Sequence, residues 1–255
     1  MIVQTNPDAP DAAFSKLSFL AMARANVFRL LALAFYDPTP EFIQQFVSGA
    51  YVSELHGYYS DLVSHHNTNV DALDPLKKYQ AGLSTSDPAE LLKEFKVEYA
   101  RLFIGPGTPV VQPYETFYRE NRNAEGQPLL IVSPEALAVE KAYLEAGLAM
   151  SEEKRDPPDH FAVELEFLFY LSRKESDAWT QADNEAAKKW RRRELAFFEE
   201  HLGSWGRRFC NKVQTESDHP FYRSIASFAG ILLELEGSYT LKSSSNETHS
   251  TTQHK

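Results

Sequence analysis

Cysteine is almost absent from this sequence, which has one in 255 residues. Cys210 therefore has no partner for an internal disulfide, and no second thiol is available to build a thiolate metal site. We expect it to be a small buried apolar residue. The core must come from side-chain packing alone, and a chain that is 43% hydrophobic and 13% aromatic can supply one.

Targeting and membrane signals are also lacking. Residues 1–13 contain no basic region followed by an apolar run, so no signal peptide is predicted. No uninterrupted apolar stretch approaches the roughly 18 residues of a membrane span. The apolar segment Phe161–Leu171 is short and contains two glutamates. We therefore expect a cytoplasmic protein without stable membrane insertion.

Positive charge is in deficit. The chain has 26 Lys and Arg residues against 36 Asp and Glu residues, a formal charge of −10. This balance argues against phosphate backbones and anionic lipids as general partners, so no nucleic-acid binding is expected, whereas a cationic ligand would be attracted. The basic run Lys188–Arg193 is predicted to lie on an amphipathic helix that also carries glutamates, as a solvated face with salt bridges.

Signals for nucleotides and metals are weak. Gly105–Gly107 is glycine-rich but lacks the lysine and hydroxyl of a phosphate loop, and it is predicted to end a helix. His160 and Glu164 are four residues apart, a spacing at which one helix can present both to a metal. The other histidines form no second motif of recognisable spacing, so no cofactor is predicted. A helical metalloenzyme using His160 and Glu164 stays as an alternative.

Helical periodicity is present through most of the chain. Apolar residues recur at three- and four-residue intervals, as from Phe14 to Phe35, and no alternating run predicts a sheet. The fold class is therefore all-α. Asp159 and Asp218 are predicted to be the N-caps of the helices that follow them. The helices delimited by the pattern are 14–35, 40–47, 51–63, 88–103, 134–148, 160–173, 184–202 and 221–235.

One helical domain is expected from residue 14 to 238. Residues 1–13 and the tail 239–255 are expected to be disordered, since the tail is dominated by Ser, Thr, Asn, His and Gln without an apolar anchor. The proline-containing segment within residues 150–159 excludes helix and is a candidate hinge.

Two motifs carry a family resemblance. Glu98–Phe103, nine further residues and then Pro113–Thr116 resemble the signature E-x3-L-F-x9-P-x-x-S of the TorD/DmsD family of redox-enzyme maturation chaperones. The segment Asp159–Phe167 is similar to the second signature of that family, an Asp-His pair followed by E-L-x-F. Threonine replaces the usual serine at position 116 and keeps the hydroxyl. The matched motif residues are Glu98, Leu102, Phe103, Pro113, Thr116, Leu165 and Phe167.

The resemblance implies a compact, TorD-like bundle of about ten helices that is a chaperone and not an enzyme. Members of this family bind the twin-arginine signal peptide, and often the body, of a molybdenum-cofactor enzyme of the DMSO reductase type. They hold the enzyme back from export until its cofactor is loaded. The implied partner is therefore a molybdoenzyme catalytic subunit, bound by a monomer or a dimer, because some relatives exchange halves between protomers.

A groove between the two motif segments is the hypothesis for leader binding. Aromatic residues would supply apolar and stacking surface, and carboxylates would bind the two arginines. The aromatic candidates are Tyr114, Phe117 and Tyr118, and the acidic candidates are Asp156, Asp159, Glu115 and Glu164.

His160 would hydrogen-bond the peptide backbone or orient Asp159, or it would only cap and pack the helix start. Leu102, Phe103, Leu165 and Phe167 are expected in the core. Glu98 is expected to pair with Arg101 or with the Pro113 loop.

Two other interpretations remain open at this point. Glu164 and Glu166 can be partly buried carboxylates satisfied by hydrogen bonds or by an arginine, with no role in binding. The chain can also be a helical scaffold without leader specificity, which would bind the folded body of its partner alone.

Overall fold

The computed structural model describes residues 12–65, 71–83, 86–119, 133–150 and 156–250. The α-helices in these ranges are α1 Ala12–Ala34, α2 Pro40–Val47, α3 Ala50–His65, α4 Asp74–Ala81, α5 Pro88–Tyr99, α6 Pro134–Glu145, α7 Phe161–Thr180, α8 Asn184–Glu200, α9 Leu202–Glu216 and α10 Pro220–Ser250. Two short turns complete them, the π-helix η1 Ala100–Ile104 and the 3-10 helix η2 Glu115–Phe117. The predicted all-α class and the count of about ten helices are confirmed for the described residues.

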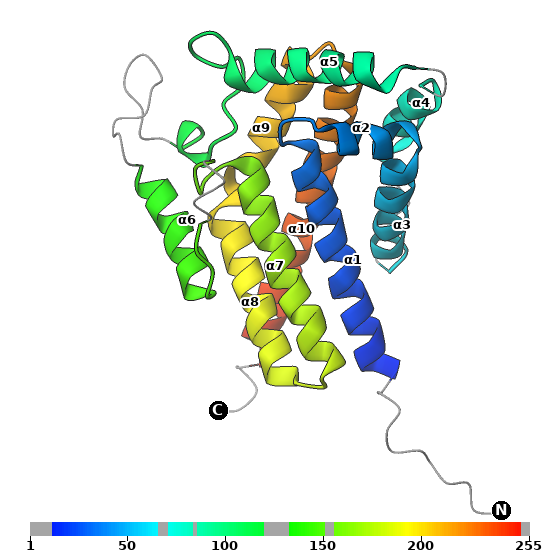
Figure 1. The fold of residues 1–255 in the computed structure, drawn as a ribbon. Coiled ribbons are helices and arrows are strands. Elements are labelled where there is room, and N and C mark those ends of the chain that lie inside the picture. Colours follow the sequence, from blue (N-terminus) through cyan, green and yellow to red (C-terminus); the bar gives the residue numbers. More distant parts are fainter. Residues whose placement is uncertain (1–11, 66–70, 84–85, 120–132, 151–155, 251–255) are drawn as a thin grey trace, which may run out of the picture.

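The centre of the bundle is the antiparallel pair of α1 and α7. Figure 1 shows these two helices side by side, with α8 next to α7 and α3 along the other flank of α1. Helices α9 and α10 pack against each other behind this pair, and α5 crosses one end of the bundle above α2. The start of α7 and the end of α1 therefore lie at the same end of the molecule.

Two groups of aromatic rings fill the interior. The ring centroid of Phe161, at the start of α7, lies 4.4 Å from that of Phe209 and 4.8 Å from that of Phe35. In the second group the rings of Phe95 and Phe221 are 4.7 Å apart. All five side chains are buried. Ring pairs of this kind add about 0.5–1.5 kcal/mol each beyond area burial, so they fix how α7 and α9 approach α1.

All eight predicted helices are present, and the three predicted to begin at a capping side chain followed by proline do so. The side chains of Thr39, Asp87 and Ser133 accept amide hydrogen bonds at the starts of α2, α5 and α6, and a proline follows each. Helices α4 and α9 were not predicted. The first has a weak apolar pattern, and the second follows α8 after His201 alone, without a proline or glycine to mark the break.

Histidines, and not the predicted aspartates, cap α7 and α10. Nδ1 of His160 accepts a hydrogen bond from the amide of Ala162 at 3.2 Å, and Nδ1 of His219 accepts one from Phe221 at 3.3 Å. The prediction that Asp159 and Asp218 cap these helices is therefore wrong. In each Asp-His pair the cap lies one residue later than predicted, which frees the aspartate for other contacts.

The last helix is longer than predicted. Helix α10 continues to Ser250, whereas the apolar pattern ends near Leu235. A search for core-facing periodicity does not detect a helix end with few apolar residues, and the expectation of disorder after residue 238 stays a prediction. Residues 1–11 and 251–255, and residues 151–155 of the candidate hinge, lie outside the described residues.

One helix has the length and composition of a membrane span, contrary to expectation. It is the stretch Phe14–Ala34 of α1, and 56% of its most apolar window is buried inside the protein. Arg24, near its middle, is ion-paired with glutamates of α7 and α8. An apolar helix covered by its neighbours and holding a paired arginine is what the centre of a helical bundle requires.

Two glycines offer a matched test of helix packing. A Cβ on Gly206 of α9 would lie 2.8 Å from Cδ1 of Leu233, whereas a Cβ on Gly57 of α3 would have no neighbour within 4 Å. We expect Gly206→Ala to lower the free energy of unfolding by about 1–3 kcal/mol through overpacking. Gly57→Ala should raise it by about 0.5–1 kcal/mol, because alanine is the better helix former. Urea denaturation measures both, and a Gly206→Ala variant as stable as wild type would contradict the close packing of α9 on α10.

Candidate functional site

The two motif segments meet at the start of α7, as predicted. The amide of Phe161 donates to the carbonyl oxygen of Pro113 at 2.8 Å, and the amide of Glu115 donates to the carbonyl oxygen of Asp159 at 2.9 Å. These two bonds form an isolated antiparallel bridge between Tyr114 and His160. Segments that are more than forty residues apart in the sequence are thereby fixed side by side.

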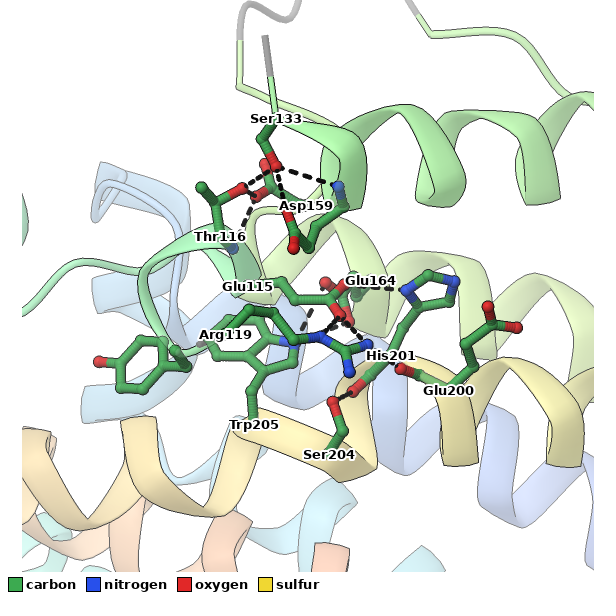
Figure 2. Close-up of polar contacts among 12 residues, drawn as sticks. Glu115, Thr116, Arg119, Ser133, Asp159, Glu164, Glu200, His201, Ser204 and Trp205 are labelled. Carbon is green, nitrogen blue, oxygen red and sulfur yellow. Dashed lines mark hydrogen bonds and ion pairs between the residues drawn. The ribbon is translucent and has the colours of Figure 1, made fainter. Parts of the chain in front are cut away.

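Asp159 is the centre of a buried polar network that locks this junction. One of its carboxylate oxygens accepts from the amide of Thr116 at 3.1 Å and lies 2.5 Å from the Thr116 hydroxyl. The same hydroxyl is 2.5 Å from Oγ of Ser133, the N-cap of α6 (Figure 2). Burial raises the pKa of Asp159, and the bonds from Thr116 oppose that rise. The hydroxyl that threonine keeps at position 116 thus ties α6 and η2 to α7.

Two further carboxyl groups lie deeper. Glu115 and Glu164 are both 0% exposed. One oxygen of Glu115 accepts from Nε of Arg119 at 2.7 Å, and the other lies 2.9 Å from Nδ1 of His201. Both oxygens of Glu164 lie 3.2 Å from the indole nitrogen of Trp205 (Figure 2). Burial, and next the charge of Glu115, raise the pKa of Glu164 well above its ordinary value.

Three of the predicted leader-binding carboxylates are therefore not available at the surface. Asp159, Glu115 and Glu164 face the interior, and each has a donor from this chain. Buried carboxylates need such partners, since an unpaired one costs several kcal/mol. In this structure the three carboxyl groups are satisfied internally, which is the alternative interpretation given above for Glu164, and their role in binding the leader stays a prediction.

His160 is also buried, and its ring lies between two tyrosines. The ring of Tyr36 is stacked on it at 6.0 Å, and the ring of Tyr114 meets it edge-on at 5.4 Å. Because Nδ1 accepts from the backbone of α7, the ring has to be in its neutral form. Of the roles considered for His160, the structure shows capping and packing.

A surface of tyrosines and carboxylates remains at this end of the bundle. Burial, and next the negative charges of Asp156 and Asp37, raise the pKa of Tyr99. For Tyr114 the second cause after burial is again Asp156. Three tyrosines therefore experience a negative potential beside the bridge. We call this the tyrosine–acid surface, and its members are Tyr36, Tyr114, Asp37, Asp156 and Glu166, with Tyr99 buried behind them.

Sequence reasoning named Tyr114 and Asp156 of this surface as binding residues, but it did not name Tyr36 or Asp37. Tyr36 and Asp37 end the first helix and lie far from both motifs in the sequence, so only the packing of α1 against α7 brings them here. Of the predicted aromatic residues, Phe117 lies beside Tyr114, with ring centroids 6.1 Å apart. Tyr118 instead stacks on Trp205 at 5.2 Å and does not join the surface.

The remaining motif residues stabilise the packing of the helices. Glu98 accepts from Nε of Arg101 at 2.7 Å and from the hydroxyl of Ser217 at 2.5 Å, so it ties η1 to the connection between α9 and α10 and not to the Pro113 loop. The predicted core residues are all buried, namely Leu102, Phe103, Leu165 and Phe167. Packing of the core therefore accounts for these residues of the motif.

The geometry of His160 and Glu164 argues against a metal site formed by these two residues. Nδ1 of His160 and the carboxyl of Glu164 bind separate donors, at Ala162 and Trp205. In the described ranges no group of three or more His, Cys, Asp or Glu side chains is placed to hold a metal ion. In the basic run of α8, Arg191 pairs with Glu194 at 2.7 Å, as expected of a salt-bridged face.

Comparison with known proteins gives a consistent result. The family model described as nitrate reductase delta subunit matches residues 66–211. A chaperone protein TorD of Vibrio atlanticus is 24% identical over 85% of this chain and 94% of its own length. A selenate reductase assembly chaperone protein of Thauera selenatis is 31% identical, and a chlorate reductase assembly chaperone protein of Ideonella dechloratans is 29% identical, each over 53% of this chain and 66% of its own length.

Proposed function

Because this chain belongs to the nitrate reductase delta subunit family, we propose that it is a cytoplasmic assembly chaperone for the catalytic subunit of a molybdenum-cofactor oxidoreductase. The relatives named as chaperones, two of them for reductases, support a holding role in place of catalysis. The ligand in this proposal is a polypeptide, which the chaperone keeps from export until assembly is complete.

The part of the client that binds the tyrosine–acid surface is its twin-arginine leader. Arginine has only donors and a planar cation, which suits carboxylates and aromatic faces together. The observation that carries this proposal is the geometry at the junction of the two motifs, where the rings of Tyr36 and Tyr114 flank His160 at 6.0 and 5.4 Å and the exposed Asp37 follows Tyr36. This surface supplies both kinds of group in one place.

An apolar groove beside this surface fits the apolar part of a leader. It has a volume of about 400 Å³ along α5 and is joined to the acidic end by the ion pair of Lys96 with Asp37 at 3.3 Å. Val97 in the groove is 64% exposed, and Ile104 beyond it is 58% exposed. The lining residues are Ala89, Leu92, Lys93, Lys96, Val97 and Ala100. Burial of such side chains by a ligand is favourable at about 25 cal/mol per Å².

A titration with a synthetic twin-arginine leader tests the proposal. We expect the double variant Asp37→Asn, Asp156→Asn to bind about 10-fold more weakly, a loss of about 1.4 kcal/mol, because two charges that face the arginines are neutralised. Binding by wild type should also weaken as salt is raised. Isothermal calorimetry at two salt concentrations measures both effects.

The matched control is the double variant Asp177→Asn, Glu185→Gln, which removes the same charge from exposed positions on α7 and α8. It should bind like wild type. Equal affinity for a leader with two lysines in place of the arginines would contradict arginine recognition. Binding of the client body with no contribution from the leader would favour the scaffold alternative.

A further inference from the structure

The side chain of Arg119 runs from the surface to a buried carboxylate. It is 34% exposed, whereas Glu115, which it contacts, is fully buried. Its Nε lies 2.7 Å and a terminal nitrogen 2.5 Å from the same oxygen of Glu115. A terminal nitrogen also donates to the carbonyl oxygen of Glu200 (Figure 2). A partly exposed guanidinium thus contacts two acceptors, one of which is a fully buried carboxylate.

The pocket around this guanidinium is built from other parts of the chain. A carboxylate oxygen of Glu115 lies 2.9 Å from Nδ1 of His201. The backbone amide of Glu115 donates to the carbonyl oxygen of Asp159, also at 2.9 Å. Glu200 ends α8, where unpaired carbonyl groups and the helix dipole favour a cation. Neither support depends on Arg119, so the pocket keeps its acceptors when that side chain leaves.

A second buried carboxyl group, that of Glu164, lies near Glu115. Glu164 accepts from Trp205, and its carboxyl is near enough for the charges of Glu115 and Arg119 to change its pKa. A pocket that offers a carboxylate, a helix-end carbonyl and a second carboxyl is a set of acceptors that complements a guanidinium, which has five donors and no acceptor.

We propose that this pocket is a guanidinium-binding site, which Arg119 occupies in the free protein and which an arginine side chain of a bound peptide occupies in its place. The proposal rests on the proposed function only for the identity of the peptide. Because Arg119 is 34% exposed while Glu115 is fully buried, a peptide arginine that replaces Arg119 would approach Glu115 from the solvent side. Arg119 is then an internal competitor that lowers the affinity for the peptide.

Chemical rescue tests the site without any peptide. In Arg119→Ala, millimolar methylguanidinium should raise the Tm by a few degrees in a saturable manner, because the ligand binds only the folded state. Methylammonium should not, and neither wild type nor the double variant Arg119→Ala, Glu115→Gln should respond to methylguanidinium. If Arg119→Ala does not fold, Arg119→Gln, which also removes the cation, serves in the same assay. Equal stabilisation of all variants, or of none, would overturn the proposal.

Competition is tested with the twin-arginine leader. Arg119→Ala should bind the leader about 10-fold more tightly than wild type, because no free energy is spent on displacing Arg119 from the site. Glu115→Gln in the same background should cancel the gain. The control is Arg208→Ala, since Arg208 donates to the carbonyl oxygen of Tyr118 at 2.5 Å and steadies the same segment from outside the pocket. It should bind like wild type.

The two proposals fail in different ways. Rescue by methylguanidinium with no leader binding by any variant would keep the guanidinium site and contradict the proposed function. Leader binding by wild type that is unchanged or weakened in Arg119→Ala would keep the proposed function and show that Arg119 is only a structural partner of Glu115.

Discussion

Replacement of Arg24 by methionine should lower the free energy of unfolding by about 3–5 kcal/mol, which is the usual cost of removing one partner from a buried ion pair. Nε of Arg24 lies 2.7 Å from Glu194 of α8, and a terminal nitrogen contacts Glu175 of α7. The buried carboxyl of Glu236, on α10, adds to the same field. One guanidinium on α1 therefore compensates acidic groups from three other helices.

An exposed ion pair between Arg29 of α1 and Glu54 of α3 provides the control. Arg29 lies 2.6 Å from Glu54, but both side chains are more than a third exposed, so Arg29→Met should cost at most about 1 kcal/mol. Restoring part of the lost stability by Glu194→Gln in the Arg24→Met background would show that the cost is one of charge and not of packing. Urea denaturation of the four proteins measures this. An equal effect of both arginine substitutions would contradict the assignment.

The same substitution should change the dependence of stability on pH. Burial raises the pKa of Glu194, but the charges of Arg24 and Arg191 outweigh it and hold this pKa below its ordinary value. A depressed folded-state pKa contributes stability above the unfolded value of 4.5 that is lost as the pH falls through the folded value. The deficit of Arg24→Met should therefore be full at neutral pH and shrink as the pH falls below 4.5.

The sequence predicts the helices well where periodicity and capping chemistry agree. At Thr39, Asp87 and Ser133 an acceptor side chain precedes a proline, and each helix begins there. Two adjacent candidate caps, as in Asp159-His160, are not resolved by the same reasoning, because either side chain can accept an amide hydrogen. Tertiary contacts decide between them, and the hydrogen bonds from Thr116 draw Asp159 away from α7.

The sequence predicts where the candidate site lies but not which of its side chains are exposed. Motif spacing indicates which two segments converge, and the bridge at Tyr114 confirms it. Spacing along a segment does not say which face another element covers. Tyr114 is half-buried while Glu115, its neighbour, is fully buried against α8 and α9. The acidic groups that are left for a ligand come partly from the end of α1, whose sequence contains no motif.

Acidification should destabilise the protein through His160 by about 3 kcal/mol between pH 6.5 and pH 4. Burial lowers the pKa of His160 from 6.5 to about 4. A histidine with a depressed folded-state pKa contributes its full stability above pH 6.5, and this contribution is lost as the pH falls, at about 1.4 kcal/mol per unit. The unfolded chain binds the proton first, whereas the folded ring would have to give up its bond from Ala162.

The variant His160→Asn isolates this contribution, because asparagine is a good N-cap that does not titrate. Glu164 acts in the opposite direction, since its raised pKa makes the folded state relatively more stable in acid. The informative quantity is therefore the difference between wild type and His160→Asn, measured by urea denaturation at several pH values from 7.5 to 4. As the pH falls, wild type should lose more free energy of unfolding than His160→Asn does. A difference that stays constant with pH would contradict the assignment of His160 as an uncharged N-cap. Because the His160 ring lies between Tyr36 and Tyr114, its protonation should also disturb the tyrosine–acid surface, so leader affinity should fall over the same range in wild type more than in the variant.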